Sequence, residues 1–298
     1  MNTQSLFILL ALLTAIFSCK TSEKSLYPAN ASPNLVAEGF AFTEGPAVAP
    51  NGDVYFTDQP NNRIHRWSAE TGDVSIYMEN AGRANGLYFD NQGNLLACAD
   101  EKFQLWQIDK NKAIKVLADG FEARDFNGPN DLWVDQKGGI YFTDPYYQRP
   151  YWERTEMDMD SQRVYYRSPN DQEVQVVADH FIRPNGIIGT NDGKTLYIAD
   201  IGDKKTYKYP VQKDGKLGKP ELFVSMGSDG MTIDEKGNVY LTGNGVTIFN
   251  PKGEQIGHIP VPQKWTANVT FGGKDRKTLF ITASNAVYTM KMNIQGAR

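Results

Sequence analysis

The chain has few of the residues on which several common kinds of site depend. Among its 298 residues are only two cysteines and three histidines. Cys19 lies at the end of a leader-like segment, so Cys98 would be alone in the mature chain and an intramolecular disulfide is excluded. With so little histidine, a Ser-His-Asp hydrolase is disfavoured. His65, His180 and His258 all fall in strand patterns, where structural roles are expected.

No apolar run is long enough to cross a bilayer. The longest, Leu6–Phe17, is interrupted only by Thr14 and has the length of a signal-peptide hydrophobic region. It is followed by Ser18-Cys19, and Ile16-Phe17-Ser18-Cys19 resembles a bacterial lipobox. We therefore expect residues 1–18 to be a lipoprotein signal peptide and Cys19 to be lipidated. The alternative is an ordinary signal peptide with a coincidental cysteine.

This leader predicts an exported lipoprotein, anchored to a membrane of the bacterial periplasm or the outer membrane. Residues 19–33 are rich in Ser, Lys and Asn and are interpreted as a flexible tether. Residues 34–298 would then form the folded domain.

The chain also has no excess of charge of either sign. The net charge is −4, with 22% charged and 40% apolar residues, so neither a disordered chain nor a nucleic-acid-binding protein is indicated. We expect no nucleic-acid partner and a monomer or weak oligomer. The aromatic content of 12% suits a β-rich fold.

What the chain does contain is one motif repeated six times: a strand, a polar turn with glycine, and a second strand. The copies begin at Thr43, Ala84, Pro129, Pro184, Ser228 and Ala267. Strand repeats separated by about 40–50 residues are typical of β-propellers. Residues 34–298 divided among six blades give about 44 residues each, a normal four-stranded blade. We predict an all-β, six-bladed propeller.

The ends of the repeat predict how the ring closes. LVAEGF at Leu35 resembles VLADGF at Val116 and VVADHF at Val176, each of which leads into a new blade. The first copy has no blade of its own. We expect it to pair with the C-terminal strands at 278–283 and 286–292, which would complete blade 6 and remove open sheet edges.

The second residue of each copy is oxygen-bearing and is expected to face the central channel. These lead residues are Glu44, Asn85, Asn130, Asn185, Asp229 and Asn268. Two carboxylates with amide oxygens suit Ca²⁺, whereas the absence of Cys and His from these positions argues against structural zinc. The alternative is that Asn-Gly and Asp-Gly merely form turns; Glu44 in the same position favours a metal site.

The motifs resemble the SMP-30/gluconolactonase/LRE family. The resemblance is carried by TEGP around Glu44, FNGPNDL at 126–132, YFTDPYY at 141–147, RPNGI at 183–187 and SDGM at 228–231. It implies a divalent metal, usually calcium, held by Glu44, Asn185 and Asp229. Mg²⁺, Mn²⁺ or Zn²⁺ could replace it.

The resemblance also implies substrate contacts. Asn130 would ligate the metal or bind substrate, and Asn127 is a further substrate candidate. An insertion at 145–162 carries Tyr146, Tyr147, Tyr151 and Trp152, which could stack on a sugar, together with Arg149 and Arg154. Tyr146 and Arg149 are the predicted substrate-binding residues of this segment. The alternative is a loop packed on the rim of the propeller.

The expected activity is calcium-dependent hydrolysis of a sugar lactone such as gluconolactone, an esterase reaction of class EC 3.1.1.17. Asp229 is the candidate base or nucleophile, and the Asn130 amide would stabilise the oxyanion. Two alternatives remain open. One is a phosphotriesterase or esterase using the same metal site; the other is a non-catalytic propeller that binds a protein or glycan.

Overall fold

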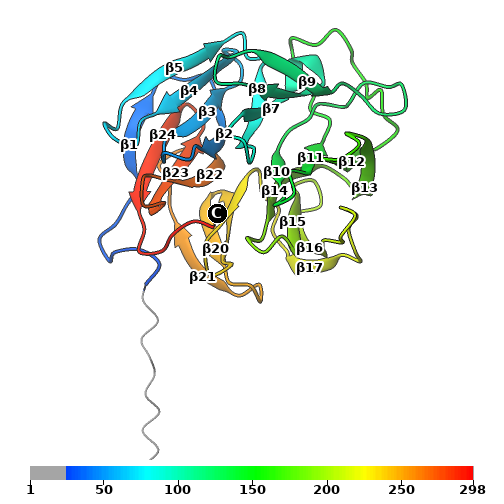
Figure 1. Ribbon diagram of the computed structural model, residues 1–298. Coiled ribbons are helices and arrows are strands. Elements are labelled where there is room, and N and C mark those ends of the chain that lie inside the picture. The colour runs from blue at the N-terminus through cyan, green and yellow to red at the C-terminus, as the bar shows by residue number, and fades with distance from the viewer. Residues whose placement is uncertain (1–24, 298) are drawn as a thin grey trace, which may run out of the picture.

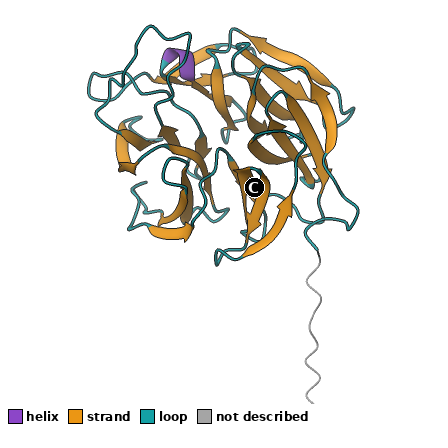
Figure 2. Ribbon diagram, turned by 180° about the vertical axis from the view of Figure 1, so that it is seen from behind, coloured by secondary structure: helices purple, strands orange, loops and turns teal. Residues whose placement is uncertain are grey.

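The computed structural model describes residues 25–297, which form six antiparallel four-stranded sheets around a central axis (Figure 1). The predicted leader and Cys19 lie outside the described residues. Figure 2 shows how completely strands dominate, with the short 3₁₀ helix η1 (Asp100–Lys102) as the one helix of the described chain. The predicted all-β, six-bladed propeller is confirmed.

The first three blades follow the chain in order. Blade 1 is β2 (Thr43–Val48), β3 (Val54–Asp58), β4 (Arg63–Trp67) and β5 (Val74–Glu79). Blade 2 is β6 (Ala84–Phe89), β7 (Leu95–Ala99), β8 (Gln104–Ile108) and β9 (Ile114–Ala118). Blade 3 is β10 (Leu132–Val134), β11 (Ile140–Asp144), β12 (Gln162–Arg167) and β13 (Val174–Phe181).

The last three blades complete the ring. Blade 4 is β14 (Pro184–Gly189), β15 (Thr195–Asp200), β16 (Lys205–Pro210) and β17 (Glu221–Val224). Blade 5 is β18 (Met231–Ile233), β19 (Val239–Gly243), β20 (Gly245–Phe249) and β21 (Gln255–Ile259). Blade 6 is β22 (Thr266–Gly272), β23 (Thr278–Ala283), β24 (Ala286–Lys291) and β1 (Asn34–Glu38).

The N-terminal strand closes blade 6 as predicted. β1 pairs antiparallel with β24, with Leu35 opposite Tyr288 and Glu38 opposite Ala286. The Thr43 hydroxyl adds a 3.0 Å hydrogen bond to the carbonyl of Ala286. The two ends of the chain therefore share one sheet, and the ring has no seam between unpaired edges.

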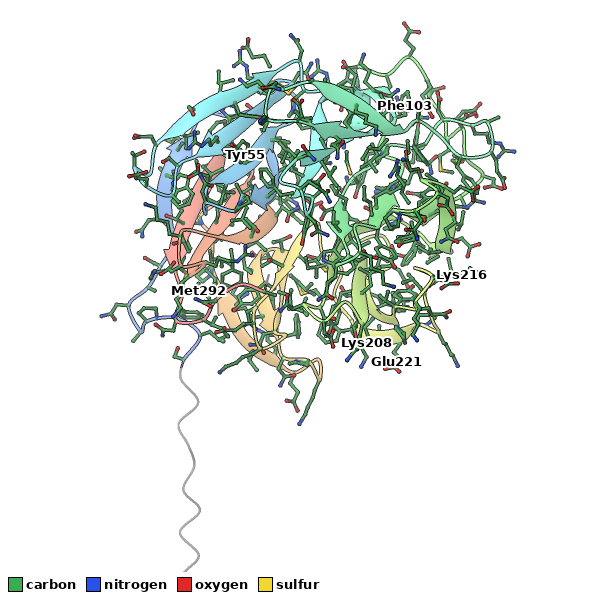
Figure 3. The ribbon with its side chains drawn as sticks, viewed as in Figure 1. Tyr55, Phe103, Lys208, Lys216, Glu221 and Met292 are labelled. Carbon is green, nitrogen blue, oxygen red and sulfur yellow. The ribbon has the colours of Figure 1, made fainter. Side chains whose placement is uncertain are left out.

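The hydrophobic core is divided into six clusters, and each lies between two neighbouring blades. Cys98 belongs to the cluster between blades 2 and 3 and is fully buried, as expected for a small core residue. Polar residues lie on the outer strands: Lys208 of β16 and Glu221 of β17 form a 3.1 Å ion pair at the edge of blade 4 (Figure 3). Packing between blades, rather than within a single sheet, thus holds the ring together.

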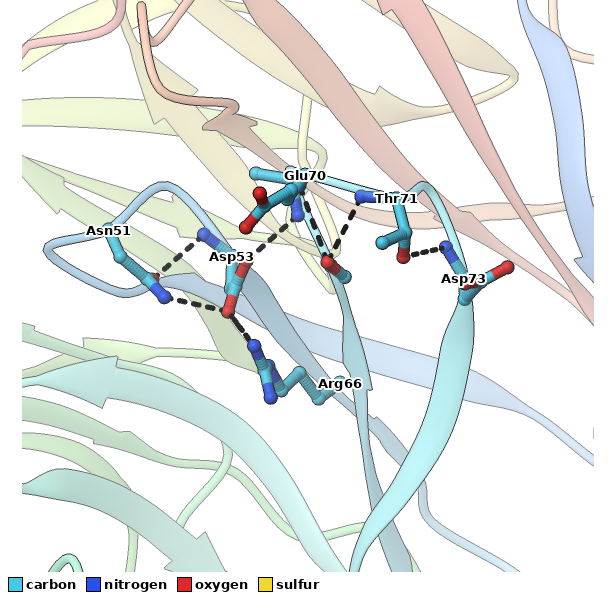
Figure 4. Close-up of polar contacts among 8 residues, drawn as sticks. Asn51, Asp53, Arg66, Glu70, Thr71 and Asp73 are labelled. Atoms are coloured by element: carbon cyan, nitrogen blue, oxygen red, sulfur yellow. Dashed lines mark hydrogen bonds and ion pairs between the residues drawn. The ribbon is translucent and has the colours of Figure 1, made fainter.

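The polar turn of each repeat is closed by side chains. In blade 1 the Asp53 carboxylate accepts hydrogen bonds from Asn51 Nδ2 at 2.8 Å, Arg66 Nε at 2.7 Å and the Ala69 amide at 2.8 Å (Figure 4). Asp90, Asp135 and Asp234 close the corresponding turns of blades 2, 3 and 5 through backbone amides. These turns explain why glycine and aspartate recur at this point of the motif.

Part of the predicted tether is in contact with the propeller. Leu26, Tyr27 and Ala31 pack against the cluster between blades 5 and 6, and the Leu26 carbonyl accepts a 2.9 Å bond from the amide of Asn293. From Ser25 onward, therefore, the segment predicted to be a flexible tether is docked, because its apolar residues are covered by blades 5 and 6. Among residues 25–297, no helix is long and apolar enough to cross a membrane.

Candidate functional site

The six lead residues lie in a ring at one mouth of the channel. The inner strands β2, β6, β10, β14, β18 and β22 contact one another in turn around the axis. Glu44, Asn85, Asn185 and Asn268 lie in these strands, whereas Asn130 and Asp229 lie just before β10 and β18. All are buried except Asp229, which is half-buried. The convergence predicted from the repeat is therefore present in the structure.

Glycine after the lead residue allows the inner strands to approach closely. A Cβ atom on Gly45 would lie 2.0 Å from the carbonyl oxygen of Asn85, and one on Gly230 would lie 1.9 Å from Cγ of Asn268. A Cβ atom on Gly86 would lie 2.5 Å from the carbonyl oxygen of Asn130, to which the Gly86 amide donates a 2.7 Å hydrogen bond. The Asn-Gly and Asp-Gly pairs thus serve inter-blade packing rather than a tight turn.

Asn185 and Asp229 form a hydrogen-bonded pair at the mouth. Asn185 Nδ2 donates to Asp229 Oδ1 at 2.7 Å and to the hydroxyl of Tyr147 at 2.9 Å. The second carboxylate oxygen of Asp229 accepts from Trp265 Nε1 at 2.5 Å. Because both Asn185 N–H groups are donated, its Oδ1 atom is the one left to accept or ligate.

Glu44 and Asn268 form a second contact in the same ring. Asn268 Nδ2 lies 3.4 Å from Glu44 Oε2, which also accepts from the Gly45 amide at 2.8 Å. Burial, together with the charge of nearby Asp229, raises the pKa of Glu44 well above its usual range. The two predicted carboxylate ligands are thus close enough to repel each other.

Asp131 is a third carboxylate in the ring, and the sequence reasoning missed it. It follows Asn130 in the position that is glycine in four of the other copies. Its Oδ1 atom accepts from the Leu132 amide at 2.9 Å, and the Asn268 side chain also bonds to it. Burial raises its pKa to about 7. The replacement of glycine by aspartate was the signal that could have identified it.

The electrostatics of the mouth favour a bound cation. Burial raises the pKa of Asp229 to about 6, although hydrogen bonds from Trp265 and Asn185 and the charge of Arg149 act in the opposite direction. Arg149 forms its ion pair with Asp100 instead, at 3.4 Å. Buried carboxylates that repel one another are stabilised when a cation is placed between them.

The donor types fit a hard cation. Glu44 and Asp229 offer carboxylate oxygens, and Asn185 and Asn130 offer amide oxygens, the ligand set that Ca²⁺ accepts. In the described chain, residues 25–297, no group of three or more His, Cys, Asp and Glu side chains is arranged to hold a metal. A metal at this mouth would therefore take amide donors together with the two carboxylates.

Two other predicted substrate residues, Asn127 and Tyr146, make their hydrogen bonds to residues outside the pair. Asn127 is fully buried, and its Nδ2 donates to the carbonyls of Asp144 and Ser161 at 3.2 and 3.0 Å. Tyr146 bonds to Gln148 and Gln162 within and beside the insertion. The structure brings Tyr147, rather than Tyr146 or Asn127, into contact with Asn185.

The insertion packs on the rim of the propeller and also reaches the Asn185–Asp229 pair. Trp152 is buried against Phe103, with ring centroids 5.1 Å apart, and the Arg154 guanidinium lies 3.7 Å from the Phe103 ring centroid, which is rim packing. Tyr151 donates to Asp100 at 2.5 Å. Through Tyr147 the same segment reaches Asn185, so it spans the mouth from blade 2 to blade 4.

The aspartates at the ends of the second strands mostly bind backbone. Asp58, Asp144 and Asp200 each accept two amide hydrogens from the segment that enters their own blade. Asp100 differs, because it binds Tyr151 and Arg149 of the insertion. In blade 2 the repeated position has become an anchor for this segment.

The histidines have structural surroundings. His65 stacks on Phe56 with ring centroids 5.3 Å apart. His180 Nε2 lies 3.0 Å from the Tyr209 hydroxyl, and His258 Nδ1 lies 3.2 Å from that of Thr247. All three belong to the third or fourth strands of their blades, away from the channel.

The fold and the site place this protein in the class of six-bladed propellers with a ring of carboxylates and amides at one mouth of the channel. Comparison with known proteins identifies the family. Residues 42–285 match the SMP-30/Gluconolactonase/LRE-like region. The chain belongs to this family, which confirms the resemblance recognised in its motifs.

Three relatives illustrate the similarity. The chain is 27% identical to a gluconolactonase of Zymomonas mobilis, across 88% of this chain and 82% of the relative. It is 27% identical to the pentonolactonase XacC of Haloferax volcanii, across 81% of each chain. The structure of XC5397 from Xanthomonas campestris, described as a gluconolactonase, superposes with a TM-score of 0.83 at 26% identity, covering 89% of this chain and 90% of that one.

Proposed function

We propose that this protein is a calcium-dependent lactonase that hydrolyses a sugar lactone such as glucono-1,5-lactone to its aldonic acid. The observation that carries the proposal is the hydrogen-bonded Asn185–Asp229 pair beside Glu44 at the mouth of the channel. The lactonase relatives support the reaction type. Glu44, Asn185, Asp229 and Asn130 would hold the cation.

Calcium bound by these residues would polarise the carbonyl group of the lactone. The Asp229 carboxylate is the candidate to accept a proton from the attacking water or to attack the carbonyl carbon itself. The half-buried position of Asp229 leaves it open to the mouth. The Asn130 amide would donate to the developing oxyanion, and cleavage of the ring C–O bond would then release the acid.

The test is proton release from glucono-1,5-lactone by purified protein, before and after chelation, with the spontaneous opening of the lactone subtracted. We expect saturable turnover that disappears with chelator and returns with Ca²⁺. Mg²⁺, Mn²⁺ and Zn²⁺ would be compared at equal concentration. Metal-independent turnover would contradict the calcium requirement.

Absence of turnover would be informative when combined with thermal unfolding. Because a ligand that binds only the folded state stabilises it by about 2.7 kcal/mol at one hundred times its Kd, calcium should raise Tm if the site is real. A calcium-dependent Tm without lactonase activity would direct the search to other esters or phosphotriesters. A protein unaffected by calcium in both assays would favour the binding propeller.

We also propose export and lipidation of Cys19, on the sequence evidence alone. The test is metabolic labelling with a fatty acid and membrane fractionation of the wild type and of Cys19→Ser. Label and membrane association should be lost in the variant. Equal label in both would contradict a lipid at Cys19.

A further inference from the structure

Two aromatic side chains from distant parts of the chain contact the Asn185–Asp229 pair. Tyr147 belongs to the insertion between β11 and β12, and Trp265 lies just before β22. Neither residue is among the predicted metal ligands. Their polar atoms nevertheless lie 2.9 and 2.5 Å from the two members of the pair.

Tyr147 holds the Asn185 amide through a second hydrogen bond, beside the one that Asp229 accepts, and Asp229 fixes which way the amide faces. A rotation of the amide by 180° would place Oδ1 where Nδ2 now donates to Tyr147 and Asp229. That rotation would set the amide oxygen against the carboxylate oxygen, since neither can donate. With the observed orientation, Oδ1 stays available to a cation.

The Trp265 contact restrains Asp229 from the other side. The indole N–H can only donate, so it fixes Asp229 Oδ2 while Asn185 fixes Oδ1. The Trp265 side chain is 38% exposed, which is high for a tryptophan held by packing alone. The hydrogen bond to Asp229 is the specific polar contact that its position provides.

We propose that Tyr147 and Trp265 are positioning residues, which orient the Asn185 amide and the Asp229 carboxylate for a divalent cation. This inference rests on the proposed function in one respect, because it requires the divalent cation. It does not depend on which substrate the protein hydrolyses. Residues that orient metal ligands typically affect metal affinity 10–100-fold when they are removed. Comparable losses are expected here.

Phenylalanine substitutions separate this role from packing. Tyr147→Phe removes one oxygen but keeps the ring that lies between the guanidinium groups of Arg149 and Arg183, 5.3 and 4.9 Å from its centroid. Trp265→Phe keeps an aromatic ring at the mouth but removes the N–H group. Neither variant alters the backbone of an inner strand.

The experiment is calorimetric titration of Ca²⁺ into the wild type, both single variants and the double variant. Each single variant should raise the Kd for Ca²⁺ about tenfold or more. Because both act on one hydrogen-bonded pair, the double variant should raise it by a factor different from the product of the single effects. In a lactonase assay at low calcium the single variants should lose activity, and excess calcium should restore most of it.

Matched controls remove equivalent groups elsewhere. Tyr209→Phe removes a hydroxyl of blade 4 that is hydrogen-bonded to His180 of blade 3. Trp106→Phe removes an indole N–H group that donates to Gln104 within blade 2. These control variants should change stability alone, and their Kd for Ca²⁺ should stay within twofold of wild type. Tyr147→Phe and Trp265→Phe variants with Kd values in that same range would overturn the proposal.

The two proposals fail in different ways. A wild type that binds Ca²⁺ but opens no lactone would contradict the lactonase function, while the shifts in Kd would still decide the positioning roles. A wild type that hydrolyses lactones without binding Ca²⁺ would overturn the positioning proposal and the metal requirement, but not lactone hydrolysis.

Discussion

The two mouths of the central channel are made by opposite ends of the same six inner strands, yet they differ in chemistry. At the N-terminal ends lie Glu44, Asn185 and Asp229 with their inter-blade hydrogen bonds. At the C-terminal ends a cavity of about 590 Å³ is lined by residues that include Tyr88, Trp133, Ile188 and Arg276. In Figure 1 the C-terminal tail runs toward the centre of the ring, and Ala297 lines the cavity at this second mouth.

The large cavity and the carboxylates with raised pKa values therefore lie at opposite mouths of the channel. The second mouth offers a sizeable cavity, but its aspartates are committed to structure: Asp135 closes a turn and Asp275 pairs with Lys291. At the first mouth, Glu44, Asp131 and Asp229 have raised pKa values, and the charge of Asp229 contributes to the rise at the other two. Repulsion between buried charges, rather than the size of the opening, therefore indicates the functional end.

The largest contrast should come from removing one carboxylate at each mouth. We expect Asp229→Asn to lower kcat by about 10³, because it removes a ligand and the candidate base or nucleophile. Asp275→Asn, at the other mouth, should leave kcat within twofold. Initial rates of lactone opening would measure both. Similar losses in the two variants would erase the distinction between the mouths.

The close packing of the ring gives the next contrast. Gly230→Ala places a methyl group 1.9 Å from Asn268 Cγ between two fixed inner strands, and should lower the free energy of unfolding by about 3 kcal/mol and weaken calcium binding. Gly296→Ala places one 2.3 Å from Phe271 Cβ, but in a terminal segment that can shift. We expect Gly296→Ala to lower the free energy of unfolding by about 1 kcal/mol and to leave the calcium affinity unchanged. Urea unfolding and calcium titration would test the pair; equal destabilisation would show that the ring is no stiffer than the tail.

The smallest effect is expected in the turn between β2 and β3, at the edge of the second mouth. Burial opposes ionisation of Asp53, but hydrogen bonds from Ala69, Asn51 and Arg66 outweigh it and lower its pKa. A lowered pKa contributes stability above the ordinary Asp pKa, and this contribution is lost as pH falls through the folded-state value. Asp53→Asn should therefore cost about 1 kcal/mol at pH 7.

The difference between wild type and Asp53→Asn should shrink as pH falls below about 4, where aspartate ordinarily becomes protonated. Urea unfolding of both proteins at pH 7 and pH 3 measures this change, and calcium affinity at pH 7 should be unaffected. A difference that is constant with pH would show that the charge of Asp53 is not what stabilises the turn.

The fold was predictable because each repeat contains its own strand and turn signals. The position of Leu35 before the first blade was enough to predict that β1 pairs with β24. The lead residues were predictable for the same reason, since one position of a repeat takes one place in every blade. The contact between the N-terminal segment and the propeller was harder to predict. The polar composition of residues 19–33 did not show that Leu26 and Tyr27 would pack against the hydrophobic cluster between blades 5 and 6.

The residues around the ligand pair were less accessible to sequence reasoning. Trp265 lies outside the repeated motif, and its distance of 36 residues from Asp229 carries no periodic signal. Tyr147 was one of several aromatic residues in the insertion, and only the path of that loop selects it over Tyr146. Asp131 lay within a recognised motif, in the position after the lead residue, where most copies have glycine. Contacts between non-repeated segments depend on loop geometry, which composition does not encode.

The docking of residues 25–27 has a consequence for how the enzyme meets its substrate. Ser25, Leu26 and Tyr27 lie beside Lys236, Asn238 and Asn250, in or next to the turns at the same end of blade 5 as the second mouth. The chain thus enters the propeller on the side away from Asp229. A lipid on Cys19, as proposed, would hold that side toward the bilayer and turn the mouth with the proposed active site outward, so that a water-soluble lactone could reach it by free diffusion without first crossing the crowded membrane surface.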